Sequence, residues 1–166
     1  MKEKFSERVQ SIIKQSKEEA IELGHSYVGS EHILLGLLKI NSGKGKKILN
    51  MFNVDIKKMI NSINTKIKTS GGTLNLGHLP LTRRAERILR NSFNEASIRG
   101  DSISDDEHLL LAMLKEPEGV ASRVLKSFSL DYETVSDLIL SDNNQITEGF
   151  ENSSSIKEKS KTPTLD

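Results

Sequence analysis

The sequence contains one stretch twice. Ser30-Glu31-His32-Ile33-Leu34-Leu35 is matched by Asp106-Glu107-His108-Leu109-Leu110-Leu111, at an offset of 76 residues (107 − 31). The match continues on both sides without a gap, and the same offset joins Arg8 to Arg84, Ile12 to Ile88, Ser16 to Ser92, Glu19 to Glu95, Leu49 to Leu125 and Phe52 to Phe128. An internal repeat of this kind indicates two copies of one structural unit. Each structural prediction for one copy therefore applies to the other.

Apolar residues recur at helical spacing through each copy. In the first copy, Ser6 is a suitable N-cap for a helix that ends at Gly24, and Ser30 for a second, largely apolar helix. A third helix follows, and Asp55 caps a fourth. The corresponding residues of the second copy are Thr82, Gly100, Asp106 and Asp131. The sequence thus predicts an all-α fold of two tandem four-helix repeats, eight helices in all, with pseudo-twofold symmetry.

The domain boundaries follow from the repeat and from local composition. We expect residues 1–68 to form the first repeat, 69–80 an interrepeat linker and 81–140 the second repeat. The linker contains Ser70-Gly71-Gly72 and Pro80 and has no periodicity. Residues 141–166 are polar, and we predict that they form a flexible linker towards a further module that is absent from this chain.

Several function classes are excluded by what the sequence lacks. It has no cysteine, which excludes disulfides, zinc–thiolate sites and thiol catalysis. It contains neither a P-loop nor an H-E-x-x-H zinc motif. No apolar run reaches the ~20 residues of a membrane span, and the first residues lack the apolar core of a signal peptide. We therefore expect a cytoplasmic, monomeric domain without catalytic residues, metal or cofactor, and without affinity for membranes.

A basic run after Thr82 raises the hypothesis of nucleic-acid binding. It consists of Arg83, Arg84, Arg87 and Arg90. A nucleic-acid interface of this type predicts a steep salt dependence of affinity. The run has no interleaved aromatic residues, and the net charge of the chain is only +1. A solvated helix face is the better interpretation, and we expect no nucleic-acid partner.

Glu31 and Glu107 are the candidate binding residues, and two interpretations of them remain open. Each glutamate falls in the first turn of a predicted helix, where the helix dipole favours a carboxylate by some tenths of a kcal/mol. Alternatively, the two carboxylates form anionic pockets that receive a guanidinium group. The neighbouring His32 and His108 are more typical of buried histidines that orient a helix than of ligands.

Ser6 and Thr82 mark the N-termini of two predicted helices. Helix N-termini bind anions through their free backbone N–H groups. If these N-termini lie near the two glutamates, each site can hold a zwitterionic group, with its anion at the helix end and its cation at the carboxylate.

Three segments resemble a known family. They are Phe5-Ser6-Glu7-Arg8, the stretch from Gly24 to Leu37, and the stretch from Glu118 to Leu125. The resemblance is to the Clp N-terminal repeat domain, best to that of ClpC-type AAA+ unfoldases, which feed the ClpP protease. It covers about residues 3–140, and the last five residues look like the linker that precedes the first ATPase module.

The resemblance implies a docking domain rather than an enzyme. Its partners would be substrate proteins and MecA-like adaptor proteins, with ClpP engaged through the missing ATPase modules of a hexameric full-length protein. ATP and Mg would bind in those modules. Phosphoarginine would be recognised at two related sites, where Glu31 and Glu107 match the glutamates that hold the guanidinium. Ser6 and Thr82 are the candidate donors to the phosphoryl group, and Arg8 and Arg84 its candidate charge partners. The alternative is a regulatory module that controls ring assembly without binding substrate.

The second copy departs from the family pattern beside Glu107. It has Ser104-Asp105-Asp106-Glu107 where the pattern is close to Val-Gly-Thr-Glu. The added carboxylates would repel a phosphate, so this site is a poor phosphoarginine pocket but can receive an unmodified arginine or a basic adaptor surface. In the first copy, Lys44-Gly45 replaces the small apolar pair Val120-Ala121, and we expect a weaker third helix there.

Overall fold

The computed structural model describes residues 5–40, 43–67 and 79–141. The chain divides into two compact units, residues 1–132 and 133–166. Most of the predicted interrepeat linker, and all but the first residue of the predicted C-terminal linker, lie outside the described residues. Residues 133–141 of the second unit continue a helix that begins at 132.

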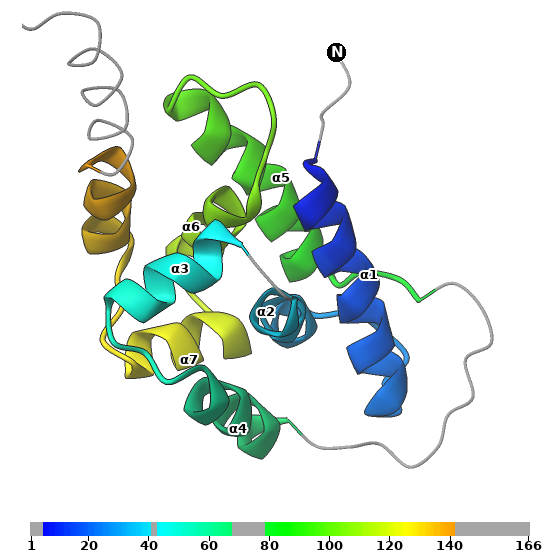
Figure 1. Cartoon of the computed structure of the whole chain (residues 1–166). Helices are drawn as coiled ribbons and strands as arrows, with labels where there is room; N and C mark the ends of the chain where they lie inside the picture. Colours follow the sequence, from blue (N-terminus) through cyan, green and yellow to red (C-terminus); the bar gives the residue numbers. More distant parts are fainter. Residues whose placement is uncertain (1–4, 41–42, 68–78, 142–166) are drawn as a thin grey trace, which may run out of the picture. The chain divides into compact units, whose positions relative to one another are not determined.

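Eight helices are present in the described part of the chain, and it contains no strand. The seven labelled in Figure 1 are α1 (Glu7–Glu22), α2 (Ser30–Lys39), α3 (Lys44–Met51), α4 (Ile56–Lys66), α5 (Arg83–Ile98), α6 (Asp106–Lys115) and α7 (Val120–Ser127). The eighth begins at residue 132. Helix starts in the two copies differ by 76 residues throughout (83 − 7, 106 − 30, 120 − 44, 132 − 56). The predicted all-α repeat fold is confirmed. Within these ranges no helix combines the length and the apolar character that crossing a membrane requires.

Three predicted N-caps are confirmed. The side-chain oxygens of Ser6, Thr82 and Asp55 accept hydrogen bonds from the backbone N–H three residues further on, at 3.1, 3.0 and 3.2 Å. Gly24 and Gly100 follow the first helix of each repeat with φ of 74° and 80°, the left-handed conformation expected at those positions.

The predicted caps Ser30 and Asp106 are wrong by one residue. The N-caps are Gly29 and Asp105, and the predicted residues are the first of their helices. The physical reason is His32 in α2 and His108 in α6, each two residues after the predicted cap. A histidine ring there turns back and accepts a hydrogen bond from the backbone N–H of the capping residue, which fixes the start of the helix.

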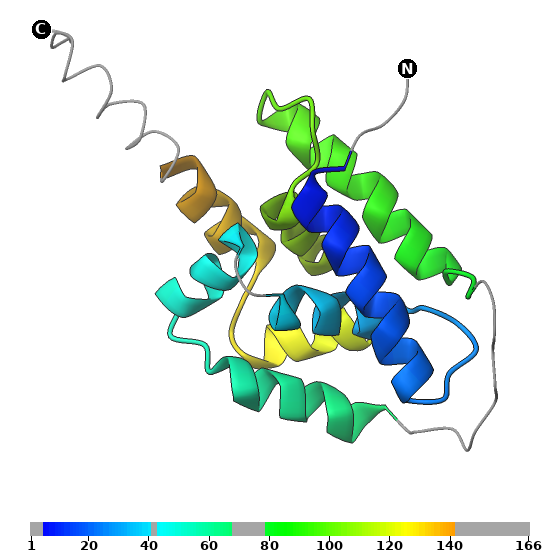
Figure 2. The same ribbon diagram turned by 45° about the vertical axis from the view of Figure 1, so that its right-hand side comes forward.

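Helices α2 and α6 form the centre of the first unit. Their apolar side chains are almost completely buried, in agreement with the predicted apolar character of α2. Helix α1 packs on α2, and α5 packs on α6. The third helices contact both repeats, because α3 packs mainly on α6 of the other repeat and α7 packs on both α2 and α6. Figures 1 and 2 show α7 from the second repeat beside α2 from the first. The two repeats therefore share one core instead of forming separate lobes.

Two short backbone pairings fasten the repeats to each other at equivalent places. Val28 donates its N–H to the carbonyl of Pro80 and accepts from the N–H of Thr82, both at 2.9 Å. The N–H of Ser6 donates to the carbonyl of Ser104 at 2.8 Å. Each pairing brings the start of the first helix of one repeat beside the start of the second helix of the other. This crossing determines which predicted residues meet.

Candidate binding sites

The Glu31 pocket lies where α2 of the first repeat meets α5 and α7 of the second. It has a volume of about 470 Å³, in the range of small-molecule sites. Residues of both charges and one apolar residue line it: Glu31, Thr82, Arg84, Glu118, Val120 and Arg123. Glu31 is half-buried, and within the described ranges no hydrogen bond or ion pair engages its carboxylate. The pocket thus holds an accessible carboxylate opposite a guanidinium at a helix N-terminus.

Arg84 is held in this pocket by packing more than by charge. Its nearest acidic partner is Glu116, with Nε and Oε1 3.9 Å apart, and the buried Nε atom has no hydrogen-bond partner. Gly119 leaves the space that the arginine needs, since a Cβ atom there would lie 2.7 Å from the arginine Cδ. Glu116 is engaged more closely by Arg87, with two hydrogen bonds of 2.8 Å. The Arg84 side chain is 39% exposed, and within the described ranges no hydrogen bond engages its guanidinium, so it keeps hydrogen-bonding capacity for an anion.

The Glu107 pocket occupies the pseudo-equivalent position and is built differently. Its volume is about 340 Å³, and its lining includes Ser6, Lys44, Asp101, Asp105, Glu107 and His108. Glu107 is 5% exposed, and its Oε2 atom lies 3.4 Å from the ammonium group of Lys44 at the start of α3. The carboxylates of Asp101, Asp105 and Glu107 line the pocket together with one ammonium group, that of Lys44. The pocket is therefore anionic, but it already contains a cation of the protein.

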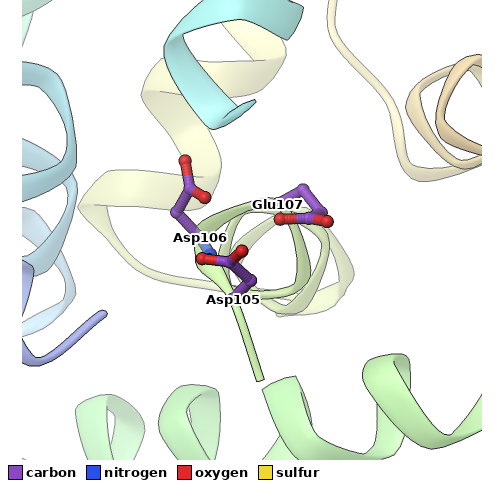
Figure 3. Close-up of side chains that lie close together, drawn as sticks. All are labelled: Asp105, Asp106 and Glu107. Carbon is purple, nitrogen blue, oxygen red and sulfur yellow. The ribbon is translucent and has the colours of Figure 1, made fainter. Parts of the chain in front are cut away.

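Figure 3 shows Asp105, Asp106 and Glu107 close together, with Asp106 directed towards the start of α3. Their carboxylate oxygens lie within 4.8 Å of one another. Asp106 accepts a 2.6 Å hydrogen bond from the N–H of Gly45, and Arg8 lies 3.3 Å from Asp105 and 3.4 Å from Asp106. Groups of the protein therefore balance these carboxylates, and the cluster by itself does not indicate a metal site.

Burial and hydrogen bonding separate the pKa values of the three carboxyl groups. Burial raises the pKa of Asp106 to about 6, against the hydrogen bond from Gly45, and the neighbouring carboxylates add to the rise. Burial also raises the pKa of Glu107, which the charge of Lys44 partly offsets. Burial acts in the same direction on Asp105, but hydrogen bonds and the charge of Arg8 outweigh it, so its pKa is lowered.

The two histidines are buried and orient their helices, as the sequence indicated. The Nδ1 atom of His32 accepts from the N–H of Gly29 at 2.8 Å, and that of His108 accepts from the N–H of Asp105 at 2.9 Å. Their Nε2 atoms face different groups. His32 meets the Nδ1 atom of His25 at 2.7 Å, whereas His108 meets a carboxylate oxygen of Asp101 at 3.2 Å.

The predicted site residues are brought together across the repeats. Glu31 shares a pocket with Thr82 and Arg84, and Glu107 shares one with Ser6. Arg8 does not line the Glu107 pocket, because Asp105 and Asp106 engage its guanidinium.

Sequence reasoning missed the part that the third helices play in both pockets. Lys44 lines one pocket and Val120 the other. The sequence did carry a signal of this role, because a lysine in one repeat stands where the other repeat has a valine.

The comparisons with known proteins identify the family. The Clp repeat (R) N-terminal domain model matches residues 4–128, and the chain therefore belongs to this family. It is 36% identical over 169 residues to the chloroplastic chaperone protein ClpC2 of Arabidopsis thaliana, matching 100% of this chain and 17% of that protein. It is 34% identical over 167 residues to the ClpA homologue of Porphyra purpurea, an ATP-binding subunit of an ATP-dependent Clp protease, again over the full chain and 20% of that protein. The chain spans a fifth or less of these relatives.

A solved structure supports the same fold. The N-terminal domain of the chaperone ClpD from Arabidopsis thaliana aligns with a TM-score of 0.65 at 20% identity, covering 85% of this chain and 95% of that one. The predicted resemblance to Clp N-terminal repeat domains is confirmed by both sequence and fold.

Proposed function

We propose that this chain is the docking domain of a ClpC-type ATP-dependent unfoldase. It receives substrate proteins and MecA-like adaptors, and ATPase modules elsewhere in a longer protein bind ATP and Mg, form the ring and engage ClpP. The domain acts by binding and carries out no reaction. Its similarity to chaperone and protease subunits about five times its length supports this proposal.

The Glu31 pocket is the observation that carries the proposal of a ligand. Within the described ranges its carboxylate has no hydrogen-bond or ion-pair partner, and Arg84 at the N-terminus of α5 lines the same pocket with a side chain that is 39% exposed. A ligand with a guanidinium next to a phosphoryl group matches this arrangement. The guanidinium pairs with Glu31 by charge-assisted hydrogen bonds, and the phosphoryl group meets Arg84 and the helix N-terminus at Thr82. Phosphoarginine on a marked protein is the ligand that we propose.

Calorimetric titration of the domain with free phosphoarginine tests this function. Wild type should bind saturably. Glu31→Gln, which removes the charge and keeps the shape, should abolish binding, and Arg84→Met should weaken it strongly. Glu22→Gln removes one charge from an exposed position at the end of α1 that does not line the pocket, and it should bind as wild type does.

Failure of folded wild type to bind would remove phosphoarginine from the proposal. Retention of adaptor and substrate binding by the domain would then leave the docking function intact. A full-length protein whose ring assembly, but not substrate delivery, depends on these residues would favour the regulatory alternative.

A further inference from the structure

Of the positions that differ between the two pseudo-equivalent pockets, three place a new charge next to the glutamate of the Glu107 pocket. Residues of the Glu31 pocket are related to those of the Glu107 pocket by the offset of 76 residues. These three pairs are Gly29 and Asp105, Ser30 and Asp106, and Val120 and Lys44. The Glu107 pocket has thus gained two carboxylates and one ammonium group relative to its counterpart.

Lys44 is placed where a ligand's cation would have to bind. Its ammonium group lies 3.4 Å from the Oε2 atom of Glu107, whose side chain is 7% exposed. Lys44 lines the same pocket as this buried carboxylate, and its own side chain is 59% exposed. The charge of Glu107 is the main cause of a raised pKa for Lys44, so the ammonium form persists at neutral pH.

The groups of the Glu107 pocket that would bind the anion of a ligand also have partners within the protein. The hydroxyl of Ser6 donates to Asp105 at 2.8 Å, and the guanidinium of Arg8 lies against Asp105 and Asp106. In the Glu31 pocket, the equivalent arginine, Arg84, has its nearest carboxylate at 3.9 Å. In the Glu107 pocket, Ser6 and Arg8 are therefore engaged by aspartates and the Oε2 atom of Glu107 by Lys44, although its buried Oε1 atom has no hydrogen-bond partner. In the Glu31 pocket, the groups that could receive the two halves of a zwitterionic ligand are available.

From these contacts we infer that Lys44 is a specificity-determining residue that closes the Glu107 pocket to cationic ligands, leaving the Glu31 pocket as the single receptor site of the domain. This inference rests on the proposed function for the identity of the ligand, but the Lys44–Glu107 pairing does not. Val120, an apolar residue at the equivalent position, leaves Glu31 open.

The first test needs no ligand. The side-chain Cε resonance of Lys44 is followed by NMR as pH is raised, in wild type and in Glu107→Gln. The pKa of Lys44 should fall towards the ordinary lysine value in the variant. Unchanged titration of Lys44 would overturn the inference whether or not phosphoarginine binds.

The second test transfers the lysine to the open pocket. Val120→Lys should place an ammonium group opposite Glu31 and weaken phosphoarginine binding by about tenfold or more, because a like charge then opposes the guanidinium. Ser127→Lys adds the same charge to an exposed position of α7 and should leave binding unchanged.

The number of phosphoarginine equivalents bound, in wild type and in Glu31→Gln, completes this test. Wild type should bind one equivalent of phosphoarginine, and Glu31→Gln none. A second equivalent that survives in Glu31→Gln, or wild-type affinity in Val120→Lys, would refute the inference. Absence of binding in every folded protein would refute the proposed ligand instead, and the NMR titration would still decide the role of Lys44.

Discussion

The histidine pair beside the Glu31 pocket predicts an acid-sensitive element; burial also lowers the pKa of the equivalent His108, but that ring faces Asp101 instead of a second histidine. In neutral His32 the Nδ1 atom accepts from the N–H of Gly29, so the ring proton is on Nε2 and is donated to His25 at 2.7 Å. A second proton would be placed on Nδ1, facing another N–H group. Burial, followed by the effect of His25, lowers the pKa of His32 to about 4.

The magnitude and the sign follow from linkage between protonation and folding. The pKa of His32 is 6.5 in the unfolded reference and about 4 in the folded protein. Each unit of difference corresponds to about 1.4 kcal/mol, so His32 contributes a change of ~3 kcal/mol. Because the folded pKa is depressed, the unfolded chain binds the proton more readily. This stability is fully present above about pH 6.5 and is lost as pH falls towards 4.

His25→Asp is the perturbation that isolates this effect, because it copies the Asp101 that faces His108 in the second repeat. The pKa of His32 should rise in the variant. The variant should gain stability over wild type as pH falls from about 6.5 to about 4, with ~3 kcal/mol as the upper limit since burial still disfavours the imidazolium.

NMR titration of the histidine ring resonances measures the pKa of His32. Urea unfolding at several pH values measures the free energy of unfolding. His108 is the internal control and should titrate above His32 in wild type and remain unchanged in the variant. The reasoning is refuted if His32 titrates near 6.5 in wild type, or if the two stability curves stay parallel.

Further predictions concern stability and are all measured by urea unfolding. Asp106 has a pKa raised to about 6, so the folded state holds its proton more tightly, and the contribution of this group to stability is lost as pH rises from about 4 to about 6, against the gain from His32. Asp106→Asn should lack this contribution, so its stability relative to wild type should rise over that range. Gly119→Ala should cost more than the ~1–2 kcal/mol expected for Gly100→Ala, because both residues have positive φ but only the former has an arginine side chain in the space of the new Cβ. Ser6→Ala should cost about 1 kcal/mol and exceed the cost of Thr82→Ala, since the serine hydroxyl also donates to an aspartate.

Local patterns in the sequence predicted the helices and most of their ends. Ser6, Thr82 and Asp55 cap helices because their short polar side chains reach a backbone N–H only three residues away. Both wrong caps, Ser30 and Asp106, occur where a histidine in the first turn accepts the backbone N–H of the residue before, which thereby becomes the cap. Several residue types can cap a helix, so a sequence alone could not decide between adjacent candidates.

Local sequence patterns could not predict which residues lie beside each glutamate in the fold. Lys44 and Glu107 are 63 residues apart, and their pairing depends on α3 packing against the α6 of the other repeat. Apolar periodicity shows which face of a helix is buried, but it does not show which helix covers that face. A repeat offset relates equivalent residues and leaves open whether the two copies pack side by side or exchange helices.

The packing of α3 on α6 of the other repeat also explains why the differences between the repeats are interdependent. Viewed along the sequence, the basic residue at the start of α3 and the acidic residues before α6 are unrelated departures from the repeat. In the fold they meet, because the carboxylate of Asp106 accepts the N–H of Gly45 while Lys44 pairs with Glu107. Removing Lys44 alone would leave three neighbouring carboxylates with less compensation, and removing the two aspartates alone would free Arg8 and the start of α3. Restoring a second open pocket therefore requires all of these positions to change together, whereas closing the first one requires only a lysine at Val120.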